Sequence, residues 1–249
     1  MSTVRNGPLV GLAGQVLLLE ILARAAGLGT AAWLAGLAYG GTLCALLSRG
    51  LNRSAGTGAD LGPADRVTLT RATLVGGVLA LTVESLSRPV PVPVLVGLAA
   101  VALALDWVDG RVARRTGTVS GLGARFDMEV DAFLILVLSA YAAGRVGGWV
   151  LAIGLMRYAN GAAEWVLPWL HGPVSPRYWR KVVAAVQGVM LAVAAAGLLP
   201  GPVVSVALGV ALALLAESFG RDVWELWRRR GPVPGGALRR GRHAHPALR

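Results

Sequence analysis

The feature that most restricts this chain is a series of eight apolar runs, each close to the length that crosses a lipid bilayer. A helix needs about 20 apolar residues to span the hydrocarbon core, and its backbone groups must be hydrogen-bonded within the segment. The sequence therefore predicts an all-α integral membrane protein. The runs lie near residues 8–24, 28–48, 67–86, 90–107, 129–145, 147–167, 182–199 and 202–219.

The composition agrees with a membrane protein and argues against a nucleic-acid-binding one. Hydrophobic residues make up 55% of the chain and charged residues 15%, whereas a soluble domain carries about a quarter charged residues. The formal net charge is +11, but the basic residues flank apolar runs and do not form a stripe with interleaved aromatics. We therefore expect the lipid bilayer, and not nucleic acid, as the partner of these charges. With Cys44 as its only cysteine, the chain has no intramolecular disulfide and no cysteine metal site.

The basic residues also predict the topology. Cytoplasmic connections of membrane proteins are enriched in Lys and Arg, and alternate connections of this chain differ sharply in that respect. One set holds only Arg24, Arg88 and Arg145. The opposite set holds Arg49, Arg53, Arg66, Arg111, Arg114, Arg115, Arg125, Arg177, Arg180, Lys181 and the Arg-rich C-terminal tail. An even number of spans with both termini in the cytoplasm fits this asymmetry.

Composition shifts divide the chain into four parts. We expect an N-terminal hydrophobic helix pair over 1–50, a linker over 51–62, a six-span membrane domain over 63–220 and a basic cytoplasmic tail over 221–249.

The acidic residues are concentrated in one place. Four of the seven aspartates fall within 26 residues: Asp106, Asp109, Asp127 and Asp131. Spacings of three and four put each pair on one helix face, so the four carboxylates can converge between two antiparallel helices. Such a group would repel itself unless cations lay between its members, and oxygen-only ligands favour Mg²⁺ or Mn²⁺. The alternative is that the acids simply pair with Arg111, Arg114 and Arg125.

The residues around these acids resemble a family signature. The string is Asp106-Trp-Val-Asp109-Gly110-Arg-Val-Ala113-Arg114, followed by Gly123, Asp127 and Asp131. It is similar to the CDP-alcohol phosphotransferase motif at all eight fixed positions and in every gap. The resemblance extends over roughly residues 63–220 and implies a six-helix transmembrane body, with the first two spans as extra N-terminal helices.

The resemblance implies roles for the motif residues. Asp106, Asp109 and Asp127 would bind two metal ions and the CDP pyrophosphate. Asp131 would be a further metal ligand or the general base that takes the proton of the acceptor hydroxyl. The remaining motif positions would contact the CDP donor: Gly110, Ala113, Arg114 and Gly123.

An upstream segment, Pro63 to Arg71, resembles the family's entry to its first helix. Thr68 and Arg71 match the usual pattern, whereas Asp65 replaces an asparagine. We expect Thr68 and Arg71 to serve the donor site, with Arg71 pointing into a polar cavity. The alternative for Arg71 is that it snorkels to the headgroups.

The acceptor side is less specific. Arg157, Asn160 and Glu164 share one face of their span, and Arg177, Arg180 and Lys181 open the next one. We expect Arg157, Arg177 and Lys181 to bind the acceptor as part of a basic pocket for a phosphorylated alcohol. They equally fit positive-inside residues with one buried Arg–Glu pair.

The resemblance implies an enzyme that transfers a phosphatidyl group from a donor such as CDP-diacylglycerol to the hydroxyl of an alcohol, with release of CMP. It further implies phospholipid biosynthesis in a bacterial inner membrane, an active site on the cytoplasmic side and a homodimer. One alternative is a small transporter that uses the acidic cluster as an ion site, but transport gives no reason for the fixed glycines, Ala113 and Arg114. An inactive scaffold is a second alternative, against which the intact set of acids argues.

Overall fold

The computed structural model describes residues 7–54, 63–116, 121–171 and 178–228, and side chains there except at 51–54, 63–64, 108–116, 121–122, 168, 171 and 178. Helices are the regular secondary structure of these residues. The α-helices are α1 (Gly7–Ala26), α2 (Thr30–Ser54), α3 (Pro63–Glu84), α4 (Val92–Thr116), α5 (Gly121–Val146), α6 (Leu151–Val166), α7 (Tyr178–Ala196) and α8 (Gly201–Arg228). Two short 3₁₀ helices, η1 (Gly148–Val150) and η2 (Pro168–His171), flank α6. The predicted all-α membrane fold is confirmed.

Each apolar run of the sequence corresponds to one α-helix. Five helices are long and apolar enough to cross a membrane, and a sixth, α4, has a shorter apolar part. Several helices extend beyond their apolar runs, because hydropathy marks contact with lipid whereas backbone hydrogen bonds continue into the polar phase. Thus α4 runs on to Thr116, α5 already begins at Gly121, and α8 ends at Arg228.

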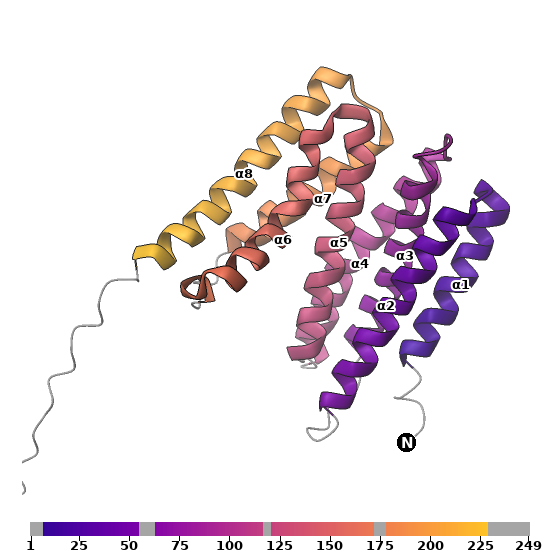
Figure 1. The fold of residues 1–249 in the computed structure, drawn as a ribbon, viewed down its shortest axis with the longest axis horizontal. Helices are drawn as coiled ribbons and strands as arrows, with labels where there is room; N and C mark the ends of the chain where they lie inside the picture. Colours follow the sequence, from indigo (N-terminus) through magenta and orange to yellow (C-terminus); the bar gives the residue numbers. More distant parts are fainter. Residues whose placement is uncertain (1–6, 55–62, 117–120, 172–177, 229–249) are drawn as a thin grey trace, which may run out of the picture.

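The centre of the bundle is α3. It contacts α1, α2, α4 and α5, and its Val75, Val78 and Leu81 are completely buried. In Figure 1 the N-terminal helices lie beside α3 at one edge of the molecule, and α8 lies at the opposite edge. Thr68 and Arg71, the residues of α3 expected at the donor site, are therefore buried among neighbouring helices.

The N-terminal pair is packed into this bundle and is not a separate unit. Gln15 of α1 lies against α3 at Gly76, where a Cβ atom would overlap the Gln15 amide. Tyr39 of α2 stacks on Phe133 of α5, with ring centroids 4.9 Å apart and an interplanar angle of 13°. Close packing on a glycine and an aromatic stack are both specific contacts, so α1 and α2 have a fixed position on the body.

The turn between α1 and α2 is fixed by a buried acid at the end of α3. Glu84 accepts a hydrogen bond from the Gly29 backbone N–H at 2.6 Å and forms an ion pair with Arg88. Arg88 in turn donates to the Gly27 carbonyl. Because Gly27 has a φ of 67°, this turn uses a conformation that glycine adopts without strain.

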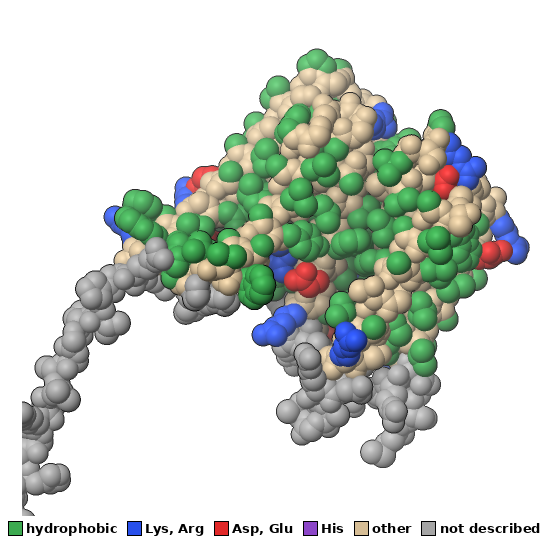
Figure 2. Space-filling view, viewed as in Figure 1, with side chains coloured by type: hydrophobic (Ala, Val, Ile, Leu, Met, Phe, Trp, Pro, Cys, Tyr) green, Lys and Arg blue, Asp and Glu red, His purple; other side chains and the backbone are tan. Residues whose placement is uncertain are grey.

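The second half of the molecule is formed by α6, α7 and α8. There α7 contacts α4, α5 and α8, while α6 contacts α5 and α8. Figure 2 shows hydrophobic side chains over the flanks of the molecule and charged side chains in a few small groups. That surface is the one expected of a protein whose helices face lipid.

Candidate active site

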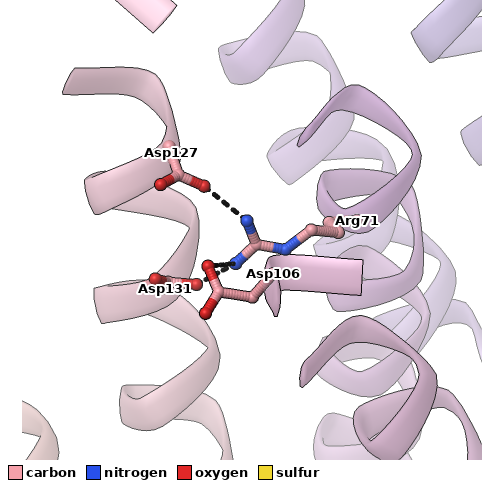
Figure 3. Close-up of polar contacts among 4 residues, drawn as sticks. All are labelled: Arg71, Asp106, Asp127 and Asp131. Carbon is pink, nitrogen blue, oxygen red and sulfur yellow. Dashed lines mark hydrogen bonds and ion pairs between the residues drawn. The ribbon is translucent and has the colours of Figure 1, made fainter. Parts of the chain in front are cut away.

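Three of the four motif aspartates meet around one buried arginine. Arg71 of α3 is only 1% exposed, and its guanidinium contacts the carboxylates of Asp127 and Asp131 on α5. Its Nη2 atom also lies 3.2 Å from Oδ1 of Asp106 on α4. Figure 3 shows the carboxylates of α4 and α5 converging on the guanidinium that α3 supplies.

The spacing of the aspartates predicted how the two acids of α5 lie, but not what brings Asp106 of α4 to them. Asp127 and Asp131 are one turn apart on α5 and face the same direction, as expected. The carboxylate of Asp106 joins them, but α4 and α5 are held together chiefly through α3 and α7, each of which contacts both. The convergence therefore depends on α3, which also supplies the arginine.

The cluster carries more negative than positive charge. One oxygen from each of Asp106, Asp127 and Asp131 lies within 4.8 Å of the others. Their side chains are 36–44% exposed, whereas Arg71 is buried beneath them. Three carboxylates and one guanidinium give a net charge of −2, which a divalent cation would offset. Carboxylate oxygens are the donors that Mg²⁺ and Mn²⁺ prefer, so this set of residues fits such an ion.

These contacts decide one of the two alternatives for the arginines. The idea that Arg71 snorkels to the headgroups is wrong, because its side chain is buried and turned toward the acids. The alternative that the acids pair with neighbouring arginines stays a prediction: among the described side chains Arg71 contacts all three acids and Arg125 is exposed. The side chains of Arg111 and Arg114 lie outside the described residues.

A large cavity opens beside the three carboxylates. Its volume is about 1350 Å³, and its wall is formed by α4 to α8. Asp106, Asp127 and Asp131 line it. It is also lined by polar side chains of α6, α7 and α8: Arg157, Asn160, Glu164, Arg180, Lys181, Gln187, Ser218 and Asp222.

Two of the three predicted acceptor residues line this cavity. Arg157 and Lys181 both line it, and so do Asn160 and Glu164 on the expected face of α6. Arg157 pairs with Glu129 at 2.6 Å, and both side chains are at least 38% exposed. The expected alternative of a buried Arg–Glu pair within α6 is therefore wrong, since Glu164 instead accepts a hydrogen bond from Asn160 at 2.9 Å. Arg177 lies outside the described residues.

The predicted donor-site residues divide into two groups. Thr68 is buried on α3, one turn before Arg71, and Gly123 lies on α5, one turn before Asp127. Asp109, Gly110, Ala113 and Arg114 belong to the last turns of α4, but their side chains lie outside the described residues.

Two features of the site were not anticipated from the sequence. The first is the ion pair between Arg180 of α7 and Asp222 of α8, at 3.2 Å, in the wall of the cavity. The second is Tyr39, which stacks on Phe133 two residues beyond Asp131. Tyr39 lies in an apolar run far from the motif, and no sequence signal marks it. Asp222 is an isolated acid near a basic segment, which is a weak signal at best.

Comparison with known proteins gives one match. The family model described as CDP-alcohol phosphatidyltransferase matches residues 63–216, which include α3 to α7 and most of α8. No curated protein and no solved structure matches the chain. The matched region contains Arg71, the three clustered carboxylates and the polar residues of α6 and α7, whereas α1 and α2 lie outside it.

Proposed function

Because the chain belongs to the CDP-alcohol phosphatidyltransferase family, we propose that it transfers a phosphatidyl group from a CDP-linked lipid such as CDP-diacylglycerol to the hydroxyl of an alcohol and releases CMP. The observation that carries this proposal is the meeting of Asp106, Asp127 and Asp131 at the edge of one large cavity. The cavity has room for a nucleotide and a second substrate together, since small-molecule sites commonly occupy about 300–1,000 Å³.

The carboxylates would hold Mg²⁺ or Mn²⁺, with Asp109 as an additional ligand and two ions in all. When bound, such ions would offset the charge of the pyrophosphate and of the departing CMP. Arg71 offsets part of the mutual repulsion of the carboxylates and keeps their oxygens facing one another. Its position beneath the cluster suits a group that orients these ligands for the donor.

The remaining donor contacts come from the ends of α3, α4 and α5. Thr68 lies one turn from Arg71 on the buried face of α3, where its hydroxyl is suited to a polar ligand. The motif positions Gly110, Ala113, Arg114 and Gly123 complete the donor site in this proposal, because small residues let a nucleotide approach the helix backbone.

Asp131 is the proposed general base. Its carboxylate faces the cavity and is 37% exposed, so an acceptor hydroxyl can reach it. The carboxylate takes the hydroxyl proton while the hydroxyl oxygen forms a bond to the phosphorus that carries the lipid. The bond from that phosphorus to the CMP oxygen breaks, and CMP leaves with the electron pair.

The acceptor is proposed to bind between the carboxylates and α6 and α7. Arg157 and Lys181 line this part of the cavity, and Arg177 is the third proposed contact. Within the described residues Lys181 has no ion-pair partner, whereas Arg157 and Arg180 each have one. A lysine without a fixed partner beside a cavity is suited to the phosphate of a phosphorylated alcohol.

The test is CMP release from CDP-diacylglycerol by the purified chain with a panel of alcohols, including glycerol 3-phosphate, inositol 1-phosphate and serine. The proposal expects release with at least one of them, and failure with all of them would contradict it. Lys181→Gln should raise the KM for a phosphorylated acceptor but not the KM for the donor. Arg221→Gln removes an equal charge outside the cavity and should change neither.

The cellular setting follows from the same proposal. We place the site on the cytoplasmic side of a bacterial inner membrane, in a homodimer, with residues 63–220 as the catalytic domain, 1–50 as its helix pair, 51–62 as the linker and 221–249 as the tail. Arg66 lies in the first turn of α3 and Ser87 in the turn that follows its last residue, Glu84, and both are exposed. Single cysteines at these positions in a Cys44→Ser background should react with an impermeant reagent from opposite sides of the membrane. Reaction of both from one side would contradict this topology.

A further inference from the structure

The wall of the cavity contains a buried amide that uses only part of its hydrogen-bonding capacity. Gln187 of α7 lines the cavity and is 1% exposed. Its Nε2 atom donates a hydrogen bond to the backbone carbonyl of Ala211 on α8 at 2.7 Å, whereas its Oε1 atom accepts none from the residues that the structure describes. Buried side-chain oxygens are nearly always hydrogen-bonded, because an unpaired one destabilises the fold. The cavity is therefore the place from which a partner for this oxygen would come.

The orientation of the amide follows from its partner on α8. A backbone carbonyl can only accept hydrogen bonds, so the Ala211 carbonyl must face the NH₂ group of Gln187 and not its oxygen. In the regular helix α8 the same carbonyl also accepts the N–H of Leu215. The group that Gln187 leaves unpaired is consequently an acceptor, and only a ligand that carries an O–H or N–H group can pair with it.

Gln187 lies on the inner side of the carboxylate cluster. A Cβ atom on the adjacent Gly188 would lie 2.7 Å from Cδ2 of Leu103, which precedes Asp106 by about one turn of α4. Gly110, a proposed contact of the donor, follows Asp106 by about one turn in the opposite direction. The donor nucleotide and Gln187 are therefore expected on opposite sides of the carboxylates.

The chemistry of the two substrates distinguishes which of them can pair with Gln187. The ester and phosphate oxygens of a CDP-diacylglycerol donor only accept hydrogen bonds. Its O–H and N–H groups belong to the cytidine, which our proposed site places beyond the carboxylates. An acceptor alcohol does carry O–H groups. If it has more than one, a second hydroxyl can donate to Gln187 while the reacting hydroxyl faces Asp131.

The same wall offers further polar groups beside Gln187. Arg180 precedes Gln187 by seven residues and therefore shares its face of α7. Ser218 and Asp222 of α8 also line the cavity, and Asp222 pairs with Arg180 at 3.2 Å. Polar groups thus continue over about 10 Å, at about 1.5 Å per residue, from Arg180 to Gln187. A small molecule with several hydroxyl groups fits such a wall better than a purely apolar one.

We propose that Gln187 is a specificity-determining residue for the acceptor, whose second hydroxyl donates a hydrogen bond to its Oε1 atom. The inference rests on the proposed transfer function and narrows the acceptor to an alcohol with two or more hydroxyl groups. A site that hydrogen-bonds a substrate hydroxyl discriminates against the analogue that lacks it, because the buried polar group of the site is then left unpaired.

The test combines two proteins with two pairs of acceptors. The first pair is glycerol 3-phosphate and 3-hydroxypropyl phosphate, which lacks the middle hydroxyl, and the second is inositol 1-phosphate and its monodeoxy analogues. The wild-type chain is compared with Gln187→Met, which keeps nearly the same size but has no amide. The KM of each acceptor in CMP release is measured, and its affinity is measured separately by titration calorimetry without donor.

The wild-type chain should favour the complete alcohol of at least one pair by about tenfold, and Gln187→Met should lose that preference. The KM of the donor should stay unchanged, since a general defect of the fold would weaken the use of both members of a pair alike. Gln15→Met makes the same exchange at a buried glutamine of α1 that does not line the cavity. It is the matched control and should retain the preference.

Two results would overturn the inference. The first is an equal preference in the wild-type chain and in Gln187→Met, which would mean that Gln187 only joins α7 to α8. The second is a wild-type chain that does not distinguish the members of either pair. Absence of CMP release with every acceptor would instead contradict the proposed function, and the calorimetric preference would still decide the role of Gln187.

Discussion

Two arginine–carboxylate clusters lie along α3, one at its last residue and one in its first half, and the clusters differ in charge balance. At one end Glu84 has a single arginine, Arg88, and both groups are also hydrogen-bonded to the turn between α1 and α2. In the first half of the helix Arg71 faces three carboxylates. A balanced pair with backbone partners satisfies its own charges, whereas an excess of carboxylates at the edge of a cavity needs a further cation. The first arrangement therefore holds helices together, and the second is suited to binding and chemistry.

The largest effect is expected from Asp106→Asn, which removes one charge from the unbalanced cluster. Metal and donor binding should fall together, and turnover should drop by at least about three orders of magnitude, because several kcal/mol of charge stabilisation would be lost. Binding of Mn²⁺ followed by electron paramagnetic resonance, measured beside CMP release, checks this. Unchanged Mn²⁺ binding would show that Asp106 is not a ligand.

The second prediction distinguishes two roles within the same cluster. Asp131→Asn keeps the shape of the side chain but removes the proton acceptor, so turnover should fall by about two to four orders of magnitude while metal and donor binding weaken only modestly. Donor binding has to be measured separately from rate. Loss of metal binding as complete as in Asp106→Asn would make Asp131 chiefly a ligand, and near-normal turnover would refute its role as base.

The balanced cluster should respond in the opposite way. Glu84→Gln keeps the size of the side chain but weakens its bonds to Gly29 and Arg88, and should lower the free energy of unfolding by about 1–3 kcal/mol. CMP release per folded molecule should remain close to normal. Thermal melting in detergent and activity of the same preparation test both statements. Loss of activity without loss of stability would contradict the distinction between a structural cluster at Glu84 and a functional cluster at Arg71.

The smallest effect is expected at Tyr39, where α2 of the N-terminal pair contacts α5, the helix that carries Asp127 and Asp131. Tyr39→Leu removes the stack on Phe133, and turnover should fall by about two- to tenfold, which corresponds to the usual worth of an aromatic pair. Tyr39→Phe keeps the ring and should restore normal turnover. Equal losses in both variants would show that the hydroxyl, and not the stack, is the important group.

The same comparison explains which parts of the molecule could be predicted from the sequence. Apolar runs located all eight α-helices of the described residues, because burial in lipid requires them, and helical spacing brought Asp127 and Asp131 to one face. The partner of those acids could not be read in this way, since Arg71 lies more than 50 residues away and its direction depends on how α3 packs between its neighbours. The same limit applies to Glu84 and Arg88, whose bonds to the turn at Gly27 and Gly29 depend on the docking of α1 and α2.

Helix ends were the other part that the sequence did not determine. The apolar run near 90–107 ends close to Asp106, whereas the helix α4 continues through Asp109 to Thr116. The acids therefore lie within helices, as their spacing predicted, although hydropathy alone did not locate the helix ends. Their mutual geometry is consequently set by regular helical structure on both α4 and α5, which is a more rigid support than a loop.

The central claim is that the carboxylates around Arg71 form a metal-dependent transfer site, and chelation tests it most directly. CMP release from CDP-diacylglycerol, with the acceptor that gives the highest rate, would be measured in one preparation before chelation, after exhaustive EDTA treatment, and after addition of Mg²⁺ or Mn²⁺. Release should fall to background with EDTA and return with either ion. Full CMP release after exhaustive chelation would contradict the claim.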